Sequence, residues 1–402
     1  MANRSFINVK LATMTGTGLG VVTNQAMTTD DKKITWIGPE SEMPPGNYIE
    51  IDGKGNWVLP GFIDCHTHLV YAGNRADEFE ARLEGKSYKQ IAEEGGGILS
   101  TVKATREASE SKLSISASIR LILMRRDSGV STIDIKSGYG LDFENEAKIL
   151  RAAADVGEEE GVRVRRGYLA AHTCPPEFKS NPDAYIDQII NEDLPRIVEE
   201  GLVDYVDAFC ENVGFTPEQT RRLFLAAKHL GMPIRLHADQ LSDLGGAGLV
   251  AEMGGLSADH VEYTSPASVA RMREHGTVAV LLPTAFYYLQ ETQKPPIAEF
   301  RRQGVPMAVA TDHNPGTSPF TSLRLAMNMA CVLFGLTPTE ALRGVTINAA
   351  KAMGLQKEIG TLEVGKAADF TLWDVEHPRD IVLELAEMGQ HRTFIGEKEN
   401  SP

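Results

Sequence analysis

The pattern of apolar and polar positions changes near residue 58 and again near residue 360. Before the first point, short alternating runs at 6–11, 20–23, 33–38 and 48–51 are separated by Gly, Asp, Asn and Pro, which predicts strands and turns. Similar runs return at 360–364, 368–373 and 392–395. We expect these two β-rich ends to pair in one small sandwich beside a central domain.

The middle of the chain alternates β-branched runs with helical patterns. Strands are predicted at 58–64, 131–135, 162–170, 205–209, 234–237, 256–260, 277–282 and 307–311. Helices are predicted between most of them, at 112–127, 144–160, 182–200, 217–229 and 265–275. Parallel strands joined by helical crossovers give an α/β fold, and eight such units predict a (β/α)8 barrel. A doubly wound sheet is the alternative, but it more often carries a Gly-rich phosphate loop after its first strand.

Metal-binding side chains gather at the predicted carboxyl ends of these strands, where a barrel has its active site. The first strand runs into His66 and His68, which are two residues apart and so point to the same face of an extended segment. His237 follows the fifth strand and Asp312 the eighth. Three nitrogens and one oxygen suit zinc or ferrous iron, with a position left for water. The alternative, that these are hydrogen-bonded core residues, needs four coincidences at one barrel end.

Other reactive side chains fit a structural interpretation better. Cys65 should point away from His66, and Cys210 has no paired cysteine or obvious base, so both are expected to be buried apolar residues. Lys136 follows the second strand, whereas the fourth strand ends in Cys210 and Glu211 without a lysine. A one-metal site is therefore favoured, with Lys136 in a structural or charge-balancing role.

Composition restricts the possible partners. The 402 residues include 40 Lys and Arg against 55 Asp and Glu, a net charge of −15, so nucleic acid and anionic membranes are not expected partners. No stretch approaches 18 apolar residues, and the first ten residues lack a secretory signal pattern. The four cysteines are widely spaced, which suits a reducing compartment, and we expect a cytoplasmic protein.

Longer motifs identify a resemblance. The segment at 58–68, Val-Leu-Pro-Gly-Phe-Ile-Asp-Cys-His-Thr-His, resembles the opening of the metal-dependent amidohydrolase superfamily. Narrower motifs resemble the imidazolonepropionase family within it, over residues 56–365: Gly-Asn-Arg at 73–75, Glu-Phe at 78–79, Lys-Ser-Gly-Tyr-Gly-Leu at 136–141, Asp-Ala-Phe-Cys-Glu at 207–211, Leu-His-Ala-Asp-Gln at 236–240, Ser-Ala-Asp-His at 257–260, Leu-Pro-Thr-Ala-Phe-Tyr at 282–287 and Thr-Asp-His-Asn-Pro-Gly-Thr at 311–317. Thr284, where the family commonly has Gly, and Thr-Cys-Pro-Pro after His172 depart from the pattern.

The resemblance implies a distorted (β/α)8 barrel at 59–359 and a small β domain made of 1–58 and 360–402. It also implies a homodimer, one zinc or iron ion per subunit, and hydrolysis of the cyclic amide of 4-imidazolone-5-propanoate to N-formimidoyl-L-glutamate. By motif position the metal ligands would be His66, His68, His237 and Asp312, and His260 the proton-transfer histidine. Positions matching substrate contacts are Arg75, Tyr139, His172, Gln240, Asn314, Gly316 and Thr317.

The expected chemistry follows from these residues. Arg75 would hold the substrate carboxylate bidentately. Asp312 would take a proton from water and pass it to the leaving ring nitrogen, while His260 would orient or donate to the carbonyl oxygen. His172 and Gln240 would fix the ring.

Two alternatives to this hydrolase function are compatible with the fold. The first is a deaminase of the same superfamily, which often carries H-x-x-E after the fifth strand; Gln240 occupies the place of that acid and cannot donate its proton. The second is an inactive relative that serves as an interaction module. Such a protein should lose ligands, and all four are present.

Overall fold

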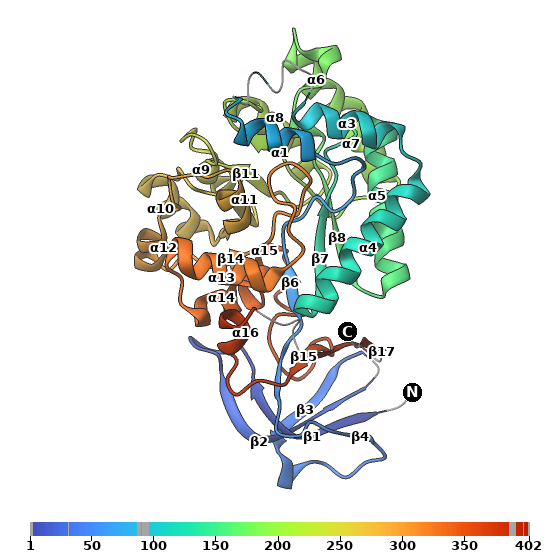
Figure 1. Cartoon of the computed structure of the whole chain (residues 1–402), viewed down its shortest axis with the longest axis vertical. Helices are drawn as coiled ribbons and strands as arrows, with labels where there is room; N and C mark the ends of the chain where they lie inside the picture. Colours follow the sequence, from blue (N-terminus) through green and yellow to red (C-terminus); the bar gives the residue numbers. More distant parts are fainter. Residues whose placement is uncertain are drawn as a thin grey trace.

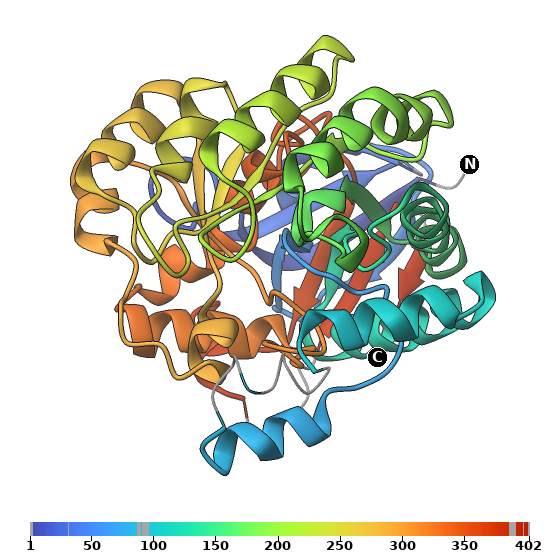
Figure 2. The same cartoon turned by 90° about the horizontal axis from the view of Figure 1, so that it is seen from above.

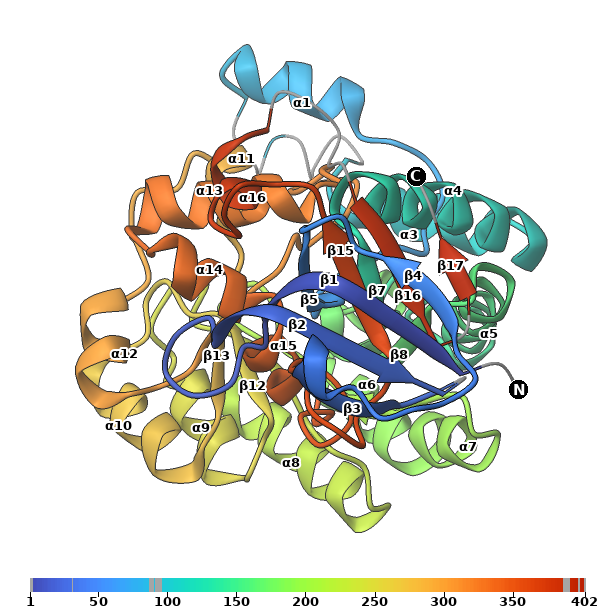
Figure 3. The same cartoon turned by 90° about the horizontal axis from the view of Figure 1, so that it is seen from below.

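A computed structural model shows a helix-covered barrel standing on a small sheet that contains both ends of the chain (Figure 1). The structure describes residues 3–30, 32–86, 90, 96–385, 391–396 and 398–400. Figure 3, seen from below, places the blue N-terminal strands across the red C-terminal strands. Among the described residues, no helix combines the length and the apolar composition needed to cross a membrane.

Hydrogen bonds link the terminal strands into a single sheet. Its members are β1 (Arg4–Ala12), β2 (Val21–Thr29), β3 (Ile34–Pro39), β4 (Ile49–Asp52), β5 (Trp57–Pro60), β15 (Asp369–Trp373), β16 (His391–Ile395) and β17 (Lys398–Asn400). β1 pairs with β2 along one edge and with β4 and then β5 along the other. The two ends of the chain meet where β5 pairs with β15. The expected sandwich is not confirmed, because the described strands form one hydrogen-bonded network.

One predicted strand of this part is wrong. Residues 360–364 form no strand, because Gly360 and Gly365 have φ of 91° and 92°, far from extended backbone. Leu362 is nevertheless buried, and its N–H donates to the carbonyl of Thr13 at 3.0 Å, a typical hydrogen-bond distance. The segment therefore packs against the sheet without joining its ladder.

The first predicted strand of the barrel divides at Gly61. Residues before it belong to β5 in the small sheet, and residues after it form β6 (Phe62–Asp64) in the barrel. A side chain at Gly61 would place its Cβ 2.2 Å from Oγ of Ser131, so only glycine fits. The division connects the small sheet directly to the amino end of the first barrel strand, and the histidines follow the opposite end of that strand.

The barrel strands are parallel and form two arcs. One arc contains β6, β7 (Val130–Lys136), β8 (Arg163–Tyr168) and β9 (Tyr205–Val206); the other contains β10 (Phe209–Cys210), β11 (Leu236–Ala238), β12 (Ser257–His260), β13 (Val278–Leu281) and β14 (Met307–Val309). Isolated bridges between Val206 and Ile234, and between Thr67 and His313, lie at the two joints. The parallel strands of the predicted barrel are thus confirmed, but its ladder is not continuous around the ring.

The predicted fourth strand is split between these arcs. Asp207 interrupts it, because Oδ1 of its side chain accepts the N–H of Ala208 at 2.8 Å in place of a ladder partner. The preceding residues pair with β8 and the following ones with β11. The interruption places the Asp207 carboxylate inside the barrel mouth.

Helices surround the strands, as Figure 2 shows from above. They are α1 (Ala76–Leu83), α3 (Ile98–Glu107), α4 (Glu110–Ser128), α5 (Phe143–Glu160), α6 (Pro182–Gln188), α7 (Leu194–Glu199), α8 (Pro217–His229), α9 (Gly246–Glu252), α10 (Pro266–His275), α11 (Pro283–Tyr288), α12 (Ile297–Gln303), α13 (Leu323–Phe334), α14 (Pro338–Gly344), α15 (Ile347–Ala352) and α16 (Asp380–Leu383). Side-chain caps begin several of them, including Ser109 at α4 and Thr216 at α8. The predicted helix at 182–200 is confirmed with a π turn (Ile189–Asp193) between α6 and α7.

Candidate metal centre and active site

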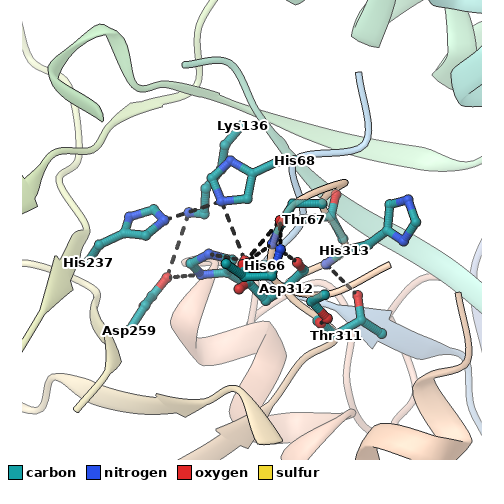
Figure 4. A network of polar contacts seen from close by, with 12 residues as sticks. His66, Thr67, His68, Lys136, His237, Asp259, Thr311, Asp312 and His313 are labelled. Carbon is teal, nitrogen blue, oxygen red and sulfur yellow. Dashed lines mark hydrogen bonds and ion pairs between the residues drawn. The ribbon is translucent and has the colours of Figure 1, made fainter. Parts of the chain in front are cut away.

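Three histidines and one aspartate converge at the carboxyl ends of β6, β11 and β14 (Figure 4). Oδ1 of Asp312 lies 3.4 Å from Nε2 of His66 and 3.5 Å from Nε2 of His68. Nε2 of His237 lies 3.4 Å from Nε2 of His68. The four predicted ligands therefore present one atom each to a common point, although 246 residues separate the first from the last in sequence number, 66 to 312.

These separations fit a bound metal ion. Four ligands at about 2.0–2.2 Å from a tetrahedral zinc ion lie roughly 3.3–3.6 Å from one another. The ring atom Nε2 of His66 is buried and has no hydrogen-bond partner among the described residues. A buried polar atom without a partner costs free energy that a metal–ligand bond would offset. The donor set and its geometry therefore fit a divalent cation.

The histidines have the protonation state that a ligand needs. Burial, together with Lys136 and the neighbouring histidines, lowers the pKa of His66 well below its ordinary value. Burial, followed by the nearby His172 and His237, does the same to the pKa of His68. Both rings are thus neutral near pH 7, with a lone pair free for a cation. Burial raises the pKa of Asp312, an effect that a cation beside it would oppose.

Local backbone geometry turns the ligands into the mouth. The N–H of Asp312 donates to the carbonyl of His66, and the N–H of His68 donates to the carbonyl of His313, which ties the end of β6 to the segment after β14. Asp312 and His260 have φ of 52° and 82°, in the left-handed region. Such strained positions are held in place by surrounding contacts and cluster at functional sites. His260 shares this space, since one of its ring nitrogens lies within 4.8 Å of a ring nitrogen of His66 and of a carboxylate oxygen of Asp312.

Two aspartates orient the ligand rings from behind. Oδ2 of Asp259 lies 2.7 Å from Nδ1 of His66, and Oδ2 of Asp207 lies 3.2 Å from Nδ1 of His237. Burial alone would raise the pKa of Asp207, but Lys136, His237 and Arg235 outweigh it and hold that pKa well below its ordinary value. The carboxylate is therefore ionised, and it favours the tautomer that leaves Nε2 free for the metal.

Sequence reasoning missed most of the buried ionic network beneath the ligands. Nζ of Lys136 lies 2.8 Å from Oδ2 of Asp207 and 3.2 Å from Oδ2 of Asp134. Arg235 donates to Asp259 at 2.8 Å and lies 3.2 Å from Asp134. All of these side chains are fully buried. Lys136 thus balances buried negative charge, as the sequence suggested.

This network could have been predicted from the alternation of side-chain direction along each strand, in which every second residue points to the same face. Asp64, Arg235 and Asp134 each lie two residues before His66, His237 and Lys136, so they point into the barrel from the same strand face. A charged residue at such a position in an otherwise apolar strand is a strong indication of an internal ionic partner.

A second group of predicted residues comes from the loops above the metal centre. The ring of His172 stacks on that of His68, with centroids 5.1 Å apart and 13° between planes. Nδ1 of His172 lies 3.1 Å from the carbonyl of Gly138, in the loop that carries Tyr139. Glu146 holds this loop, accepting three backbone N–H bonds of 2.7–2.9 Å from Gly138, Gly140 and Leu141. Burial lowers the pKa of His172 to about 3, so its ring is neutral.

A cavity of about 450 Å³ connects these groups. Its lining includes the predicted Arg75, Tyr139, His172, Gln240, His260, Asn314, Gly316 and Thr317, and ligands His68, His237 and Asp312 at its base. His66 is not in the lining but lies directly behind these ligands. Glu78, Arg82 and Glu291 also line the cavity and were not proposed as site residues from the sequence. The structure therefore brings all the predicted site residues to one cavity and its base.

Asn314 acts within its own loop. Its Oδ1 accepts the N–H groups of Gly316 and Thr317 at 2.9 and 2.7 Å. Its Nδ2 donates to the carbonyl of Asp312 at 2.7 Å and to Oγ1 of Thr317 at 2.8 Å. With its side-chain groups engaged in this way, Asn314 shapes the loop that presents Gly316 and Thr317 to the cavity.

The chain is similar to known proteins over nearly its whole length. Residues 57–399 match the amidohydrolase family. An imidazolonepropionase from Shewanella baltica (strain OS195) is 53% identical over 382 residues, covering 94% of this chain and 93% of that protein. An imidazolonepropionase from Maricaulis maris (strain MCS10) is 53% identical over 399 residues, covering 98% and 99%. Among solved structures, 5-methylcytosine deaminase from Klebsiella pneumoniae with bound 5-fluorocytosine aligns with a TM-score of 0.74 at 18% identity, covering 98% and 96%, and shares the fold.

Proposed function

The chain belongs to the amidohydrolase family, and on that premise we propose that it hydrolyses the cyclic amide of 4-imidazolone-5-propanoate to N-formimidoyl-L-glutamate. Relatives that carry the imidazolonepropionase name at 53% identity support this substrate. The observation that carries the proposal is the convergence of three Nε2 atoms and Oδ1 of Asp312 at the base of a cavity that also contains arginines; His66 and His68 lie 3.4 and 3.5 Å from Asp312, and His237 lies 3.4 Å from His68. Such a site suits a small anionic ring.

One zinc or iron ion per subunit is part of the proposal. His66, His68, His237 and Asp312 would hold it, as their spacing supports. When bound, a divalent ion supplies Lewis acidity and lowers the pKa of water at the site. Three nitrogens and one carboxylate accept either metal, so metal analysis of the purified protein decides between them.

The remaining steps use groups of the chain. Asp312 would accept a proton from the attacking water and transfer it to the ring nitrogen that leaves when the amide C–N bond breaks. His260, buried beside it, would donate a hydrogen bond to the carbonyl oxygen as negative charge develops there, a contact worth about 3–4 kcal/mol in transition states of this kind. Arg75, Tyr139, His172, Gln240, Gly316 and Thr317 would hold the ring and its side chain, with Asn314 shaping the loop.

Gln240 favours amide hydrolysis over deamination. A deaminase needs an acid that protonates a ring nitrogen so that ammonia can leave, and a glutamine amide has no proton of suitable acidity. Gln240 lines the cavity and can only donate or accept hydrogen bonds there. The deaminase alternative is tested in the same assay by measuring ammonia.

The proposed function is tested with the metal-loaded protein. Added to 4-imidazolone-5-propanoate, it is expected to abolish the ultraviolet absorbance of the imidazolone without releasing ammonia, and a chelator should prevent this. Absorbance that persists with one equivalent of metal bound would refute the proposed substrate. Ammonia release from a heterocycle or from N-formimidoyl-glutamate would favour the deaminase.

Assembly and location complete the proposal. We propose a homodimer, supported by an exposed apolar row on α4 formed by Ile115, Ile119, Ile122 and Leu123, which are 59%, 55%, 37% and 48% exposed. All four cysteines are free thiols, which supports a reducing cytoplasm. The proposed homodimer is tested by sedimentation velocity, which measures the oligomeric state.

We also propose a division into two domains. Pairing of β5 with β15 supports a small domain of 1–58 and 360–402 beside a hydrolase domain of 59–359.

A further inference from the structure

Helix α1 and the residue at its N-cap present three charged side chains to the cavity. Arg75 at the N-cap and Glu78 and Arg82 within the helix are spaced by three and four residues, and all three line the cavity. In sequence order, their side chains carry a positive, a negative and a second positive charge. How these charges pair decides which cation is free to bind an anionic ligand.

Arg75 is already neutralised by Glu78. Nε and one terminal nitrogen of its guanidinium lie 2.5 and 2.6 Å from the two oxygens of Glu78. Glu78 also accepts the N–H of Gly97 at 2.9 Å, and the side chains of the pair are only 8% and 7% exposed. A bidentate pair with this degree of burial contributes hydrogen-bond donors to the cavity but no net charge.

Arg82 has no such partner. Across the part of the chain that the structure describes, no carboxylate lies within ion-pairing distance of its guanidinium, and its buried Nε has no acceptor. One terminal nitrogen donates to the carbonyl of Gly316 at 3.2 Å, and the guanidinium lies over the ring of Tyr288 at 5.0 Å. A buried donor without an acceptor is costly, and a carboxylate is the acceptor that best matches a guanidinium.

Both arginines approach the backbone of Gly316. Arg82 donates to its carbonyl at 3.2 Å, and a Cβ built on Gly316 would lie 2.8 Å from a terminal nitrogen of Arg75. A side chain at this position would therefore clash with the Arg75 guanidinium. Glycine lets both guanidinium groups approach this loop, which Asn314 shapes beside Asp312.

We infer that Arg82 supplies the positive charge that binds the substrate carboxylate, while Arg75 serves as a neutralised hydrogen-bond donor beside it. This inference rests on the proposed function, in which the substrate is an anion. It assigns charge recognition to a residue seven positions beyond Arg75. In a chain of net charge −15, and in a cavity that Glu291 also lines, a cation without a carboxylate partner among the described residues provides the local attraction that such an anion needs.

The experiment compares a charged ligand with its neutral analogue. Binding of 3-(imidazol-4-yl)propanoate and of its carboxamide is measured by calorimetry with the metal-loaded wild type, Arg82→Met and Arg82→Lys. Wild type should bind the acid at least about 30-fold more tightly than the amide, as expected for a desolvated charge pair. Arg82→Met should reduce this preference to about twofold or less, and Arg82→Lys should restore part of it. Arg271→Met, which removes an exposed arginine on α10 that pairs with Glu252, should keep the wild-type preference.

The outcomes separate this inference from the proposed function. A preference for the acid that is unchanged in Arg82→Met, with melting temperature and metal content as in wild type, overturns the role of Arg82. Equal weakening of acid and amide assigns Arg82 to packing and overturns it as well. Failure of the proposed function appears instead as no turnover of 4-imidazolone-5-propanoate by the wild type, and the binding preference still tests Arg82 in that case.

Discussion

Oδ2 of Asp259 lies 2.7 Å from Nδ1 of His66, on the side of the ring away from Asp312. The same oxygen accepts a bond of 2.8 Å from Arg235. The contact favours the tautomer with the ring proton on Nδ1. The lone pair of Nε2 is then free and faces the proposed metal position. Asp259 is thus a positioning residue for the metal centre.

Replacing Asp259 with Asn should therefore weaken metal binding. Asn keeps the size of the side chain but removes the charge that fixes the tautomer of His66, and we expect a loss of about 10- to 100-fold in zinc affinity. Competition with a chromogenic chelator measures it. Asp134→Asn is the matched control, because Asp134 belongs to the same buried network and bonds Tyr205 at 2.6 Å rather than a ligand histidine. Equal zinc affinities in the two variants would contradict a positioning role.

Removal of Asp312 should abolish metal retention and turnover together. Ala at this position takes away Oδ1, which lies 3.4 and 3.5 Å from the ring nitrogens of His66 and His68, and also the proposed proton acceptor. We expect turnover to fall by more than about 10³-fold, within the range for loss of a proton-transfer group and a metal ligand. Metal analysis and the absorbance assay check this, with circular dichroism to confirm folding. Turnover within about tenfold of wild type would remove Asp312 from the mechanism.

Glu146→Ala should loosen the loop that carries Tyr139. The substitution leaves three backbone N–H groups without their acceptor, and we expect a loss of at least about 3 kcal/mol in the free energy of unfolding. kcat/KM should fall about tenfold, because this loop also holds His172 through Gly138. Urea unfolding and steady-state kinetics measure the two effects. Glu144→Ala, with a carboxylate 79% exposed on the same helix, should change neither by more than experimental error.

Glu146 should also make stability depend on pH. Burial raises its pKa above the ordinary 4.5, although its hydrogen bonds with Ser137 and the loop N–H groups act in the other direction. The folded protein therefore prefers the protonated carboxyl, a stabilisation that is complete below pH 4.5 and lost as pH rises through the folded pKa. The unfolding free energy of wild type minus that of Glu146→Gln should fall as pH increases from about 4.5. A difference that rises over the same interval would reverse the sign of this shift.

The cysteines should react slowly and without loss of activity. Burial raises the pKa of Cys331 to about 11 and that of Cys210 to about 12. Because the thiolate is the nucleophile, alkylation of Cys331 should accelerate about tenfold per pH unit from pH 7 toward its pKa. Mass spectrometry after iodoacetamide treatment measures the modified sites, and the absorbance assay measures the remaining turnover. Rapid modification at pH 7 with loss of turnover would assign a thiol to the active site.

Much of the architecture could be predicted because it is encoded locally. Alternation of strand and helix patterns located the helix at 217–229 at the bounds of α8, and it located six of the eight barrel strands to within two residues, the other two being divided at Gly61 and Asp207. The ligands could be predicted for the same reason: a histidine or aspartate just after a strand reaches the barrel mouth whatever packs around it. The split at Asp207 could not be predicted, since it arises from one side chain that replaces a ladder bond.

The sequence by itself thus determined the order of strands and helices, and the four candidate ligands with their shared end of the barrel. Only the tertiary structure decided which charges pair: His66 with Asp259, 193 residues away, Lys136 with Asp207, and Arg75 with Glu78 rather than with open solvent. Hydrophobic periodicity is a property of neighbouring residues and can be recognised in the sequence. The partner of a buried charge is chosen by distance in a medium of low dielectric constant, and that distance exists only after the chain has folded.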